Sequence, residues 1–575
     1  NRLFRTEIPA ERGVFLDRYG DLLVVNQRAY HQISEPTALY PHTQPITRDQ
    51  ALELTITQPF SVNYSLQRQY LRPFSMAHVL GYVTGVTAED LQQDNQYKLT
   101  DSVGRAGLES YFNDLVKGRK GFREYEINAL GKKLTEAKFE PPVQGRNLQT
   151  SLDPYLSTVA WRAMGDKTGS VVILDPETGK VLALVSTPAF DSNLFSPSNI
   201  ATEQETKLSE LRFALADEKR LFFNRSVQGT YPPGSIFKLV TALAGLESGA
   251  FDTTTEVDDQ GILEVGEYRY ANWYYTQFGR TEGLISLVRA IARSNDTYFY
   301  KAAELLGVDN LVKQAELMGF GQSTGIELAG ERAGLVPNPS WKEKTLGEKW
   351  FLGNTFHLGI GQGDLLVTPL QQAQMLQVFA NHGHLCKPSL LADSQAVNCS
   401  SIGVSEAHLL AVEQGMIEAC STGGTAYPFF SWNQQQTSRL EQNLPANKLI
   451  DSGVVACKTG TAEFGGEDER GYRKTHAWFG MTVGGLDQLL APELQVLGVN
   501  TESKSVAVDV TAEADRDLQL ERQTWLKKVQ AHGFPDSLVI VVLVESDEEQ
   551  PYREGSRDAA PVAQTIWQWL LGENN

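Results

Sequence analysis

The stretch Tyr231-Pro232-Pro233-Gly234-Ser235-Ile236-Phe237-Lys238 decides how the rest of this sequence is interpreted. Proline and glycine interrupt the preceding structure and good helix formers follow, so we expect Ser235 at a helix N-terminus with Lys238 one turn later on the same face. A serine hydroxyl needs a base to become a nucleophile, and a lysine becomes that base when burial or a nearby positive charge lowers its pKa. Taken alone, the S-x-x-K spacing is expected about twice by chance in such a chain, as an N-cap serine beside an exposed lysine.

Two further elements follow in the sequence. Ser294-Asn295-Asp296 comes after a helical run predicted over residues 284–293, and by itself it is typical of a turn between helices capped by the serine and the aspartate. Lys458-Thr459-Gly460-Thr461 continues an apolar strand predicted over residues 454–457. Burying a lysine ammonium without a partner is costly, so Lys458 at the end of a buried strand indicates an anionic ligand or a catalytic pair.

These three elements, in this order, resemble the S-x-x-K, S-x-N/D and K-[ST]-G set of the penicillin-recognising serine acyltransferases. The chain further resembles class B penicillin-binding proteins over nearly its whole length, apart from residues 484–535. The segments that carry this likeness are residues 11–20 (Glu-Arg-Gly-Val-Phe-Leu-Asp-Arg-Tyr-Gly), Gly107-Leu108-Glu109, Gly131-Lys132, Asp153 with its following helix, Gly359-Ile360-Gly361-Gln362-Gly363, and Thr368-Pro369.

The resemblance implies a D,D-transpeptidase that crosslinks peptidoglycan stem peptides through a serine acyl-enzyme and that β-lactams inhibit covalently. It makes Ser235 the nucleophile and Lys238 its general base. It assigns Ser294 to proton relay towards the leaving amine, and Asp296 to polarising or positioning Lys238 and the substrate.

The third element is implied to bind the substrate. Lys458 would lower the pKa of Lys238 by its charge and, with Thr459 and Thr461, would bind the substrate carboxylate. Backbone N–H groups of Ser235 and Thr461 would form the oxyanion hole, and Gly460 would let the substrate backbone approach the strand edge.

Asp296 in the middle element resembles the elongation-type penicillin-binding protein 2 branch, with a septal transpeptidase as the alternative. Some members of that branch hold a metal with two Asp, a His and a Cys upstream of this element. Residues 256–293 offer Asp258 and Asp259 but contain no Cys and no His, so we predict no zinc and no other cofactor.

The expected fold of the second part is α+β, an α/β sandwich, because strands near both ends enclose a helix-rich middle. The resemblance specifies a five-stranded antiparallel sheet flanked by helices. We predict the strands at residues 171–174, 181–185, 454–457, 477–480 and 538–544, a helix from Asp153-Pro154 to Trp161, and a final helix over residues 560–571. We place a domain boundary at residue 146, with an elongated mixed α/β pedestal of the dimerisation type over residues 1–146 and the transpeptidase domain over residues 147–575.

Within the second domain, residues 484–535 form an insertion between two strands. It holds an alternating stretch at Val506, Val508 and Val510 and a charged helix candidate over residues 512–532. A connection this long is either functional or a small subdomain, and both readings stay open.

Charge and hydrophobicity restrict the partners. Lys and Arg number 51 against 70 Asp and Glu, a net charge of −19, and no basic run is present to bind phosphates, so we expect no nucleic acid as a partner.

The longest apolar run, residues 538–544, is too short to span a bilayer. Because the sequence begins at Asn1, we expect that a single-pass anchor in the cytoplasmic membrane has been trimmed and that the catalytic domain is extracytoplasmic, in the periplasm. The resemblance implies that the N-terminal domain contacts a SEDS-family glycosyltransferase and an elongation scaffold protein.

Four cysteines allow a Cys386–Cys399 bridge, only weakly favoured over buried thiols.

Three other functions remain in view: a β-lactamase, for which we find no E-x-x-x-N loop, a D,D-carboxypeptidase, in which water is the acceptor, and a non-catalytic penicillin-binding sensor or scaffold. Intact Ser235, Lys238, Ser294 and Lys458 argue against the last.

Overall fold

The structure is a computed structural model of the chain. It describes residues 2–34, 43–58, 61–93, 97, 101–127, 133–196, 201–216, 219–393, 398–440, 443–499 and 513–573. Gly131-Lys132 and the alternating valines 506, 508 and 510 lie outside the described residues. In the described part of the chain, no helix combines the length and the apolar character needed to cross a bilayer.

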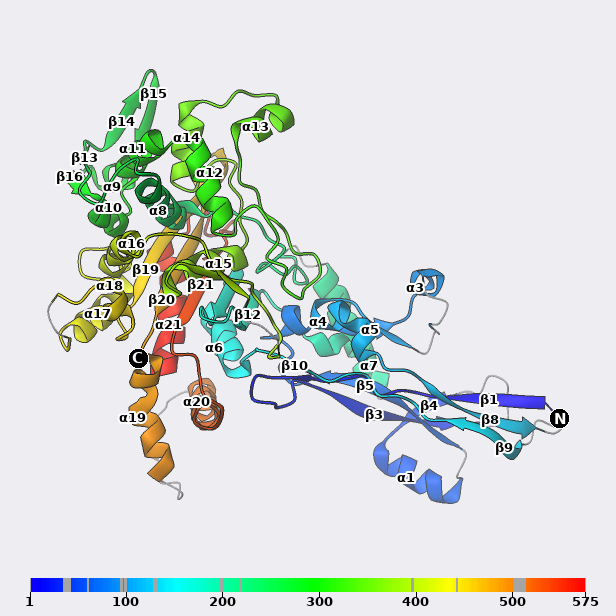
Figure 1. The fold of residues 1–575 in the computed structure, drawn as a ribbon. Coiled ribbons are helices and arrows are strands. Elements are labelled where there is room, and N and C mark those ends of the chain that lie inside the picture. Colours follow the sequence, from blue (N-terminus) through cyan, green and yellow to red (C-terminus); the bar gives the residue numbers. More distant parts are fainter. Residues whose placement is uncertain are drawn as a thin grey trace.

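A five-stranded sheet forms the centre of the larger, C-terminal part (Figure 1). Every neighbouring pair of strands is antiparallel, which confirms the predicted fold class. In spatial order the strands are β12 (Val181–Thr187), β11 (Gly169–Leu174), β21 (Leu538–Val544), β20 (Arg473–Val483) and β19 (Ala456–Glu467). β19 is therefore an edge strand, paired with β20 on one side.

The central strands are apolar at successive positions because both faces of the sheet are covered. Val539, Val541 and Leu543 of β21 belong to one core cluster, while Ile540 and Val542 belong to the other. Side chains alternate between the faces of a strand, so a strand buried on both faces reads as an unbroken apolar run. This explains why residues 538–544 were recognisable in the sequence.

Helices from different parts of the chain cover the two faces. The first core cluster joins the sheet to α8 (Lys238–Ser248), α10 (Leu287–Arg293), α11 (Asp296–Leu306), α12 (Val308–Leu317), α14 (Leu352–Gly359), α15 (Pro369–Ala380) and α16 (Glu406–Ala419). The second joins it to α6 (Pro154–Met164), α20 (Glu513–His532) and α21 (Ala560–Leu571). Short elements complete this part: α7 (Ala201–Leu215), α13 (Pro339–Leu346), α17 (Phe430–Thr437), α18 (Ala446–Ile450), β17 (His384–Cys386) and β18 (Cys399–Ser401).

Two antiparallel strand pairs extend beside α10 and α11. β13 (Glu256–Asp259) pairs with β16 (Gly283–Ser286), and β14 (Ile262–Val265) pairs with β15 (Tyr268–Ala271). The short helix α9 (Trp273–Phe278) follows β15. The prediction of a helix over residues 284–293 is wrong at its start, because residues 284–286 pair with β13 and the helix begins at Leu287.

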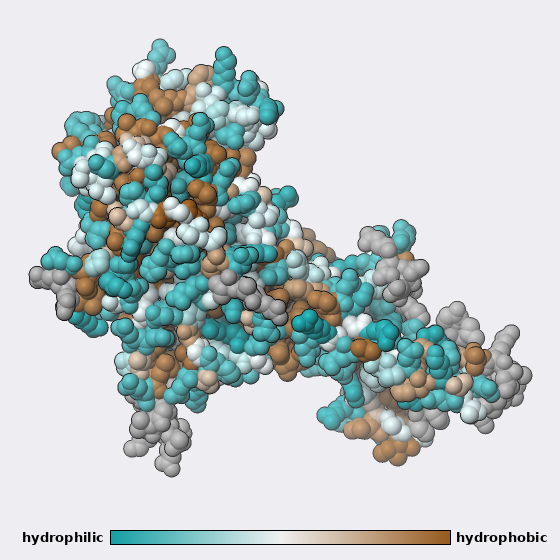
Figure 2. Space-filling model, in the orientation of Figure 1, coloured by the Kyte–Doolittle hydropathy of each residue, from teal (hydrophilic) through white to brown (hydrophobic). Residues whose placement is uncertain are grey.

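The N-terminal part is an elongated arm of small sheets (Figure 1). One sheet has the order β1-β8-β9, a second β4-β3-β5, and β6 pairs with β7. The elements are β1 (Arg2–Ile8), β2 (Phe15–Leu16), β3 (Val24–Ile33), β4 (Thr43–Ile46), α1 (Arg48–Thr57), β5 (Val62–Tyr70), α2 (Ala77–Leu80), β6 (Val83–Gly85), α3 (Ala88–Gln93), β7 (Ser102–Gly104), α4 (Gly107–Tyr111), α5 (Asn113–Val116), β8 (Gly121–Ile127), β9 (Lys133–Glu140) and β10 (Leu148–Gln149). Figure 2 shows apolar side chains over α1, where Leu52 and Ile56 are exposed.

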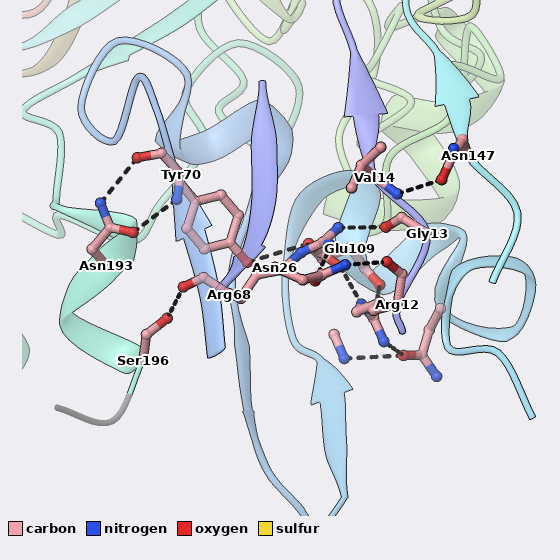
Figure 3. Close-up of polar contacts among 12 residues, drawn as sticks. Arg12, Gly13, Val14, Asn26, Arg68, Tyr70, Glu109, Asn147, Asn193 and Ser196 are labelled. Carbon is pink, nitrogen blue, oxygen red and sulfur yellow. Dashed lines mark hydrogen bonds and ion pairs between the residues drawn. The ribbon is translucent and has the colours of Figure 1, made fainter. Parts of the chain in front are cut away.

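Backbone pairing and a side-chain hydrogen bond join the start of the C-terminal part to the N-terminal arm, in addition to the chain connection. β10 pairs in parallel with β2, and Asn147 Oδ1 accepts a hydrogen bond from Val14 N at 3.0 Å (Figure 3). Residues just beyond the expected boundary at 146 thus remain attached to the N-terminal arm. The boundary itself stays a prediction.

The insertion contributes two helices, α19 (Leu486–Val499) and α20. The charged helix was predicted over 512–532, and Glu513–His532 is helical; α19 was not predicted. Trp525 of α20 is buried and its Nε1 donates to Asp153 Oδ2 at 3.1 Å, so the insertion packs against the start of α6.

Two disulfides are present, Cys386–Cys399 and Cys420–Cys457. The sequence favoured the first weakly and gave no sign of the second. Cys386 and Cys399 face each other as paired residues of β17 and β18. Cys457 on β19 meets Cys420 at the end of α16, a juxtaposition that depends on the packing of a helix on the sheet.

Candidate functional site

Ser235 lies in a 3-10 turn, Gly234–Phe237, immediately before α8. The predicted helix N-terminus is therefore displaced, since the α-helix begins at Lys238. Gly234 has φ +56°, and a Cβ there would lie 2.8 Å from Thr461 O, so only glycine lets the turn approach β19 this closely. Ser235 itself is half-buried. The turn thus holds a partly exposed serine beside the edge strand.

Hydrogen bonds from distant segments fix this turn. Gly234 N donates to Gly361 O at 2.9 Å, and Trp478 Nε1 of β20 donates to Pro232 O at 2.9 Å. Gln362 Nε2 donates to Thr461 O at 3.1 Å, which ties the same loop to β19. The glycine-rich segment 359–363 therefore lies beside both the nucleophile turn and the third element.

Lys238 is fully buried and its ammonium is held by the middle element. Its Nζ donates to Asp296 Oδ1 at 2.6 Å, to Ser294 O at 2.8 Å and to Ser294 Oγ at 3.4 Å. Burial lowers the pKa of Lys238 below the usual lysine value, while the charge and hydrogen bond of Asp296 oppose that shift. An amine in this environment loses its proton more readily than a lysine in water.

The middle element is the sharp turn between α10 and α11. Ser294 ends α10 with φ +54°, a left-handed conformation that is uncommon for a residue other than glycine. Asn295 is the N-cap of α11, its Oδ1 accepting from Tyr298 N at 2.8 Å. Ser294 is the C-cap of α10, so of the two expected caps only the aspartate is wrong. Asn295 caps α11 instead, and the Asp296 carboxylate pairs with Lys238.

Lys458 is also fully buried, on the face of β19 that carries Ala456 and Ala462. Its Nζ donates to Thr459 O at 3.0 Å. Burial, followed by repulsion from the charge of Lys238, lowers the pKa of Lys458 well below its usual value. We expected Lys458 to lower the pKa of Lys238. In the structure the principal cause at Lys238 is burial, and the repulsion is seen at Lys458.

The rest of the third element lines the free edge of the sheet. Thr459 Oγ1 hydrogen-bonds Thr425 Oγ1 at 2.7 Å. A Cβ at Gly460 would lie 3.0 Å from Trp478 Cβ and 3.2 Å from Ile236 Cγ1, so a larger residue at this position would crowd both side chains. Thr461 is half-buried. Among the described residues, β19 pairs with β20 alone, so its other edge has no strand partner there.

The predicted site residues are carried by one 3-10 turn, three helix ends and one edge strand: Ser235; Lys238, Ser294 and Asp296; and Lys458, Thr459, Gly460 and Thr461. Lys238 contacts Ser294 and Asp296, and the turn of Ser235 approaches β19 at Thr461. Their catalytic roles remain a prediction. Sequence analysis did not name Thr425, Gln362 or Trp478 as site residues, although Gln362 lies in one of the segments that carry the family likeness. Thr425 and Trp478 reach the site from a loop and a neighbouring strand and leave no local pattern.

Two aromatic residues near the site, Trp273 and His476, differ in what they contact. Trp273 is half-buried, and its backbone N–H donates to Asp296 Oδ2 at 2.9 Å, so it contacts the site through its main chain. His476 is buried, stacks on Phe464 at 4.0 Å between ring centroids, and accepts from Ser546 N. Desolvation lowers the pKa of His476 to about 4, and packing is its evident role.

Comparison with known proteins places this geometry in context. The sequence pattern of the penicillin binding protein transpeptidase domain matches residues 169–488, and that of the penicillin-binding protein dimerisation domain matches residues 47–150. A peptidoglycan D,D-transpeptidase MrdA from Acinetobacter baumannii is 31% identical over 435 residues, which cover 68% of this chain and 63% of that protein. The chain thus spans less than two thirds of the length of this relative.

Two solved structures share the fold over the whole chain. The penicillin-binding protein PBP2 in complex with MreC from Helicobacter pylori has a TM-score of 0.73 at 22% identity, covering 100% of this chain and 98% of that one. A chain from a peptidoglycan synthase complex, described as coordinating polymerization and crosslinking, has a TM-score of 0.72 at 26% identity, covering 100% and 92%.

Proposed function

Because the chain belongs to the penicillin-binding protein transpeptidase family, we propose that it is a peptidoglycan D,D-transpeptidase that crosslinks stem peptides through an acyl-enzyme on Ser235. One observation carries the proposal. A fully buried Lys238, paired with Asp296, follows a half-buried Ser235 by three residues, beside the free edge of β19. A scaffold protein has no need for a buried lysine of lowered pKa three residues after a partly exposed serine.

In the proposed acylation, Ser235 Oγ attacks the carbonyl carbon of the penultimate D-Ala of the donor peptide. The hydroxyl proton passes to neutral Lys238, the peptide C–N bond breaks, and the terminal D-Ala leaves after its amine takes a proton through Ser294. The amine of a neighbouring stem peptide then attacks the ester, which forms the crosslink and returns the proton to Ser235. A β-lactam follows the first step, its ring amide opening instead.

The edge strand supplies the proposed binding site. A peptide added antiparallel to β19 would pair with the edge of that strand that faces away from β20, as in strand addition. Lys458 adds a buried amine on the same strand, and this amine and the hydroxyls of Thr459 and Thr461 are proposed to bind the carboxylate. Backbone N–H groups of Ser235 and Thr461 are proposed as the oxyanion hole, supported by the close approach of Gly234 to Thr461.

We assign the elongation branch rather than the septal one, from Asp296 in the middle element and from the MrdA relative. By analogy with the complexes described for the two structural relatives, the N-terminal arm is proposed to meet a scaffold protein and a SEDS-family glycosyltransferase. The catalytic domain is proposed to act outside the cytoplasmic membrane. We propose that no metal or other cofactor takes part.

The test is labelling with a fluorescent penicillin, read by intact mass. The expected result is a stable 1:1 adduct that is absent in Ser235→Ala and accompanied by crosslinking of stem peptides by the unmodified protein. Rapid turnover of the penicillin would identify a β-lactamase, release of D-Ala without crosslinks a carboxypeptidase, and no adduct a scaffold. Each of these three results contradicts the proposal.

A further inference from the structure

Asp259, at the end of β13, is a fully buried carboxylate outside the three sequence elements of the site. Its partners are N–H donors and, among the groups that lower its pKa, the hydroxyl of Thr297. Oδ1 accepts from Gly261 N at 2.9 Å, and Oδ2 accepts from Asn272 Nδ2 at 2.8 Å, Asn295 Nδ2 at 2.8 Å and Glu282 N at 3.1 Å. Burial raises the pKa of Asp259, but these hydrogen bonds outweigh it, so the pKa of this carboxyl is lowered and the group is ionised.

Two of these donors connect Asp259 to the turn that holds Lys238. Asn295 is the central residue of that turn and caps α11 with its oxygen while its nitrogen bonds Asp259. Asn272 accepts from Asp296 N with its oxygen at 3.1 Å. Both amides are oriented by the carboxylate, because an acceptor on the nitrogen side fixes which way each amide faces.

The same segment also orients the side chain of Asp296. Trp273, next to Asn272, donates its backbone N–H to Asp296 Oδ2, which leaves Oδ1 for Lys238 Nζ. Asp296 is thus held at its backbone by Asn272 and at its carboxylate by Trp273. A carboxylate with both oxygens committed keeps a single orientation towards the lysine.

We infer that Asp259 is a positioning residue for acylation: through Asn272 and Asn295 it fixes the Asp296 carboxylate against Lys238. The inference rests on the proposed function, since it concerns how that lysine is prepared as a base. Asp259 touches neither substrate nor Lys238, so its effect passes through the geometry of the Asp296–Lys238 pair.

The variant Asp259→Asn tests this inference. Asparagine has nearly the same shape as aspartate, but its NH2 group would face the N–H donors that now bind the Asp259 carboxylate, so hydrogen bonds to Asn272 and Asn295 would be lost. Asp258 on the same strand provides a matched control. It is exposed, and its carboxylate accepts from Gln260 Nε2 at 2.6 Å. Asp258→Asn makes the same change of charge beside the site without touching the network.

The readout is the second-order rate of acylation by a fluorescent penicillin as a function of pH, with thermal unfolding as the check on folding. Lys238 is faced by Asp296 from α11 and Lys458 from β19, and Asp296 is faced by Glu463 of β19. Asp296 raises the pKa of Lys238, so a displaced Asp296 lets that pKa fall. For Asp259→Asn we expect a plateau rate roughly 10–100-fold lower, as displacements of about 1 Å produce, and an acid limb moved to lower pH.

A second variant, Asn272→Ala, removes the amide that connects Asp259 to the backbone of Asp296 and leaves the Asn295–Asp259 bond in place. It should move the acid limb in the same direction if Asp259→Asn does not fold. The inference is overturned if folded Asp259→Asn acylates like the Asp258→Asn control, or if its rate falls while its pH profile stays in place, which marks a purely structural role. Failure of the unmodified protein to form a Ser235 adduct would instead refute the proposed function.

Discussion

The N-terminal arm and the candidate site formed by Ser235, Lys238, Asp296 and Lys458, called the groove from here on, each place two cationic residues around one carboxylate, and they use different cationic residues. In the arm, Glu109 lies between Arg12 and Arg68, with Nε–Oε distances of 2.7 and 2.6 Å (Figure 3). In the groove, Asp296 pairs with Lys238 while Lys458 lies nearby. Arginine stays protonated in proteins, whereas a buried lysine loses its proton readily.

Hydrogen bonding separates the two clusters further. The guanidinium groups of the arm also donate to Gly13 O, Asn26 Oδ1, Asn113 Oδ1 and Glu109 O. Together with the bonds to the Glu109 carboxylate, each nitrogen of the two groups therefore has an acceptor. Within the described residues, Lys458 Nζ has one hydrogen bond, to Thr459 O. An ionic cluster in which the charged groups all have hydrogen-bond partners stabilises the fold. A cluster that has unused N–H donors and an amine of lowered pKa can instead bind a ligand and take part in proton transfer.

The largest expected effect comes from replacing Lys238 with arginine, the cationic residue that the arm uses. Lys238→Arg keeps the positive charge and removes the group that accepts the serine proton. We expect the acylation rate to fall by about 10³-fold, within the range for losing a general base. The measurement is the second-order rate with a fluorescent penicillin. Lys301→Arg, on an exposed ion pair, is the control, and a loss of less than tenfold in Lys238→Arg would refute the base assignment.

Breaking the cluster of the arm should change stability and leave chemistry intact. Glu109→Gln leaves two buried guanidinium groups without their counter-charge, which we expect to cost about 3 kcal/mol in the free energy of unfolding. Urea unfolding measures this, with Glu304→Gln of an exposed pair as the control, expected within about 0.5 kcal/mol of the unmodified protein. Acylation per folded molecule should be unchanged; a matching loss of acylation would show that the arm shapes the groove.

The pH dependence of acylation tests the carboxylate of the groove. Asp296 favours the ammonium form of Lys238, and acylation needs the neutral amine, so the rate rises as pH passes upward through the pKa of Lys238. Asp296→Asn lowers that pKa and should move the rising limb to lower pH by about one unit. A shift to higher pH in a stopped-flow pH series would contradict this arrangement.

The smallest effect is expected at the edge strand. Thr425→Ala removes the hydroxyl partner of Thr459 and should reduce the acylation rate less than tenfold, in line with the ~1 kcal/mol of a neutral hydrogen bond. Thr425→Ser keeps the hydroxyl and should restore the rate. A failure of serine to restore it would assign the effect to packing of the methyl group.

Much of the fold could be predicted because its signals are local. The strand at residues 538–544 and the helix at residues 560–571 coincide with β21 and α21, since an apolar run and an apolar helical period depend on neighbouring residues. The start of α8 and the strand at residues 284–286 were missed, because pairing with β13 and packing on β19 override local helix propensity.

The sequence by itself determined the order of the three elements, the residue types at Ser235, Lys238 and Lys458, and the strands and helices that carry them. Only the tertiary structure decided the partners. Glu109 pairs with arginines 97 and 41 residues away, Cys420 with Cys457, and Asp259 with Asn295. Such contacts form between side chains that chain folding brings together, and no local period or spacing encodes which distant group will fill a buried carboxylate's hydrogen bonds.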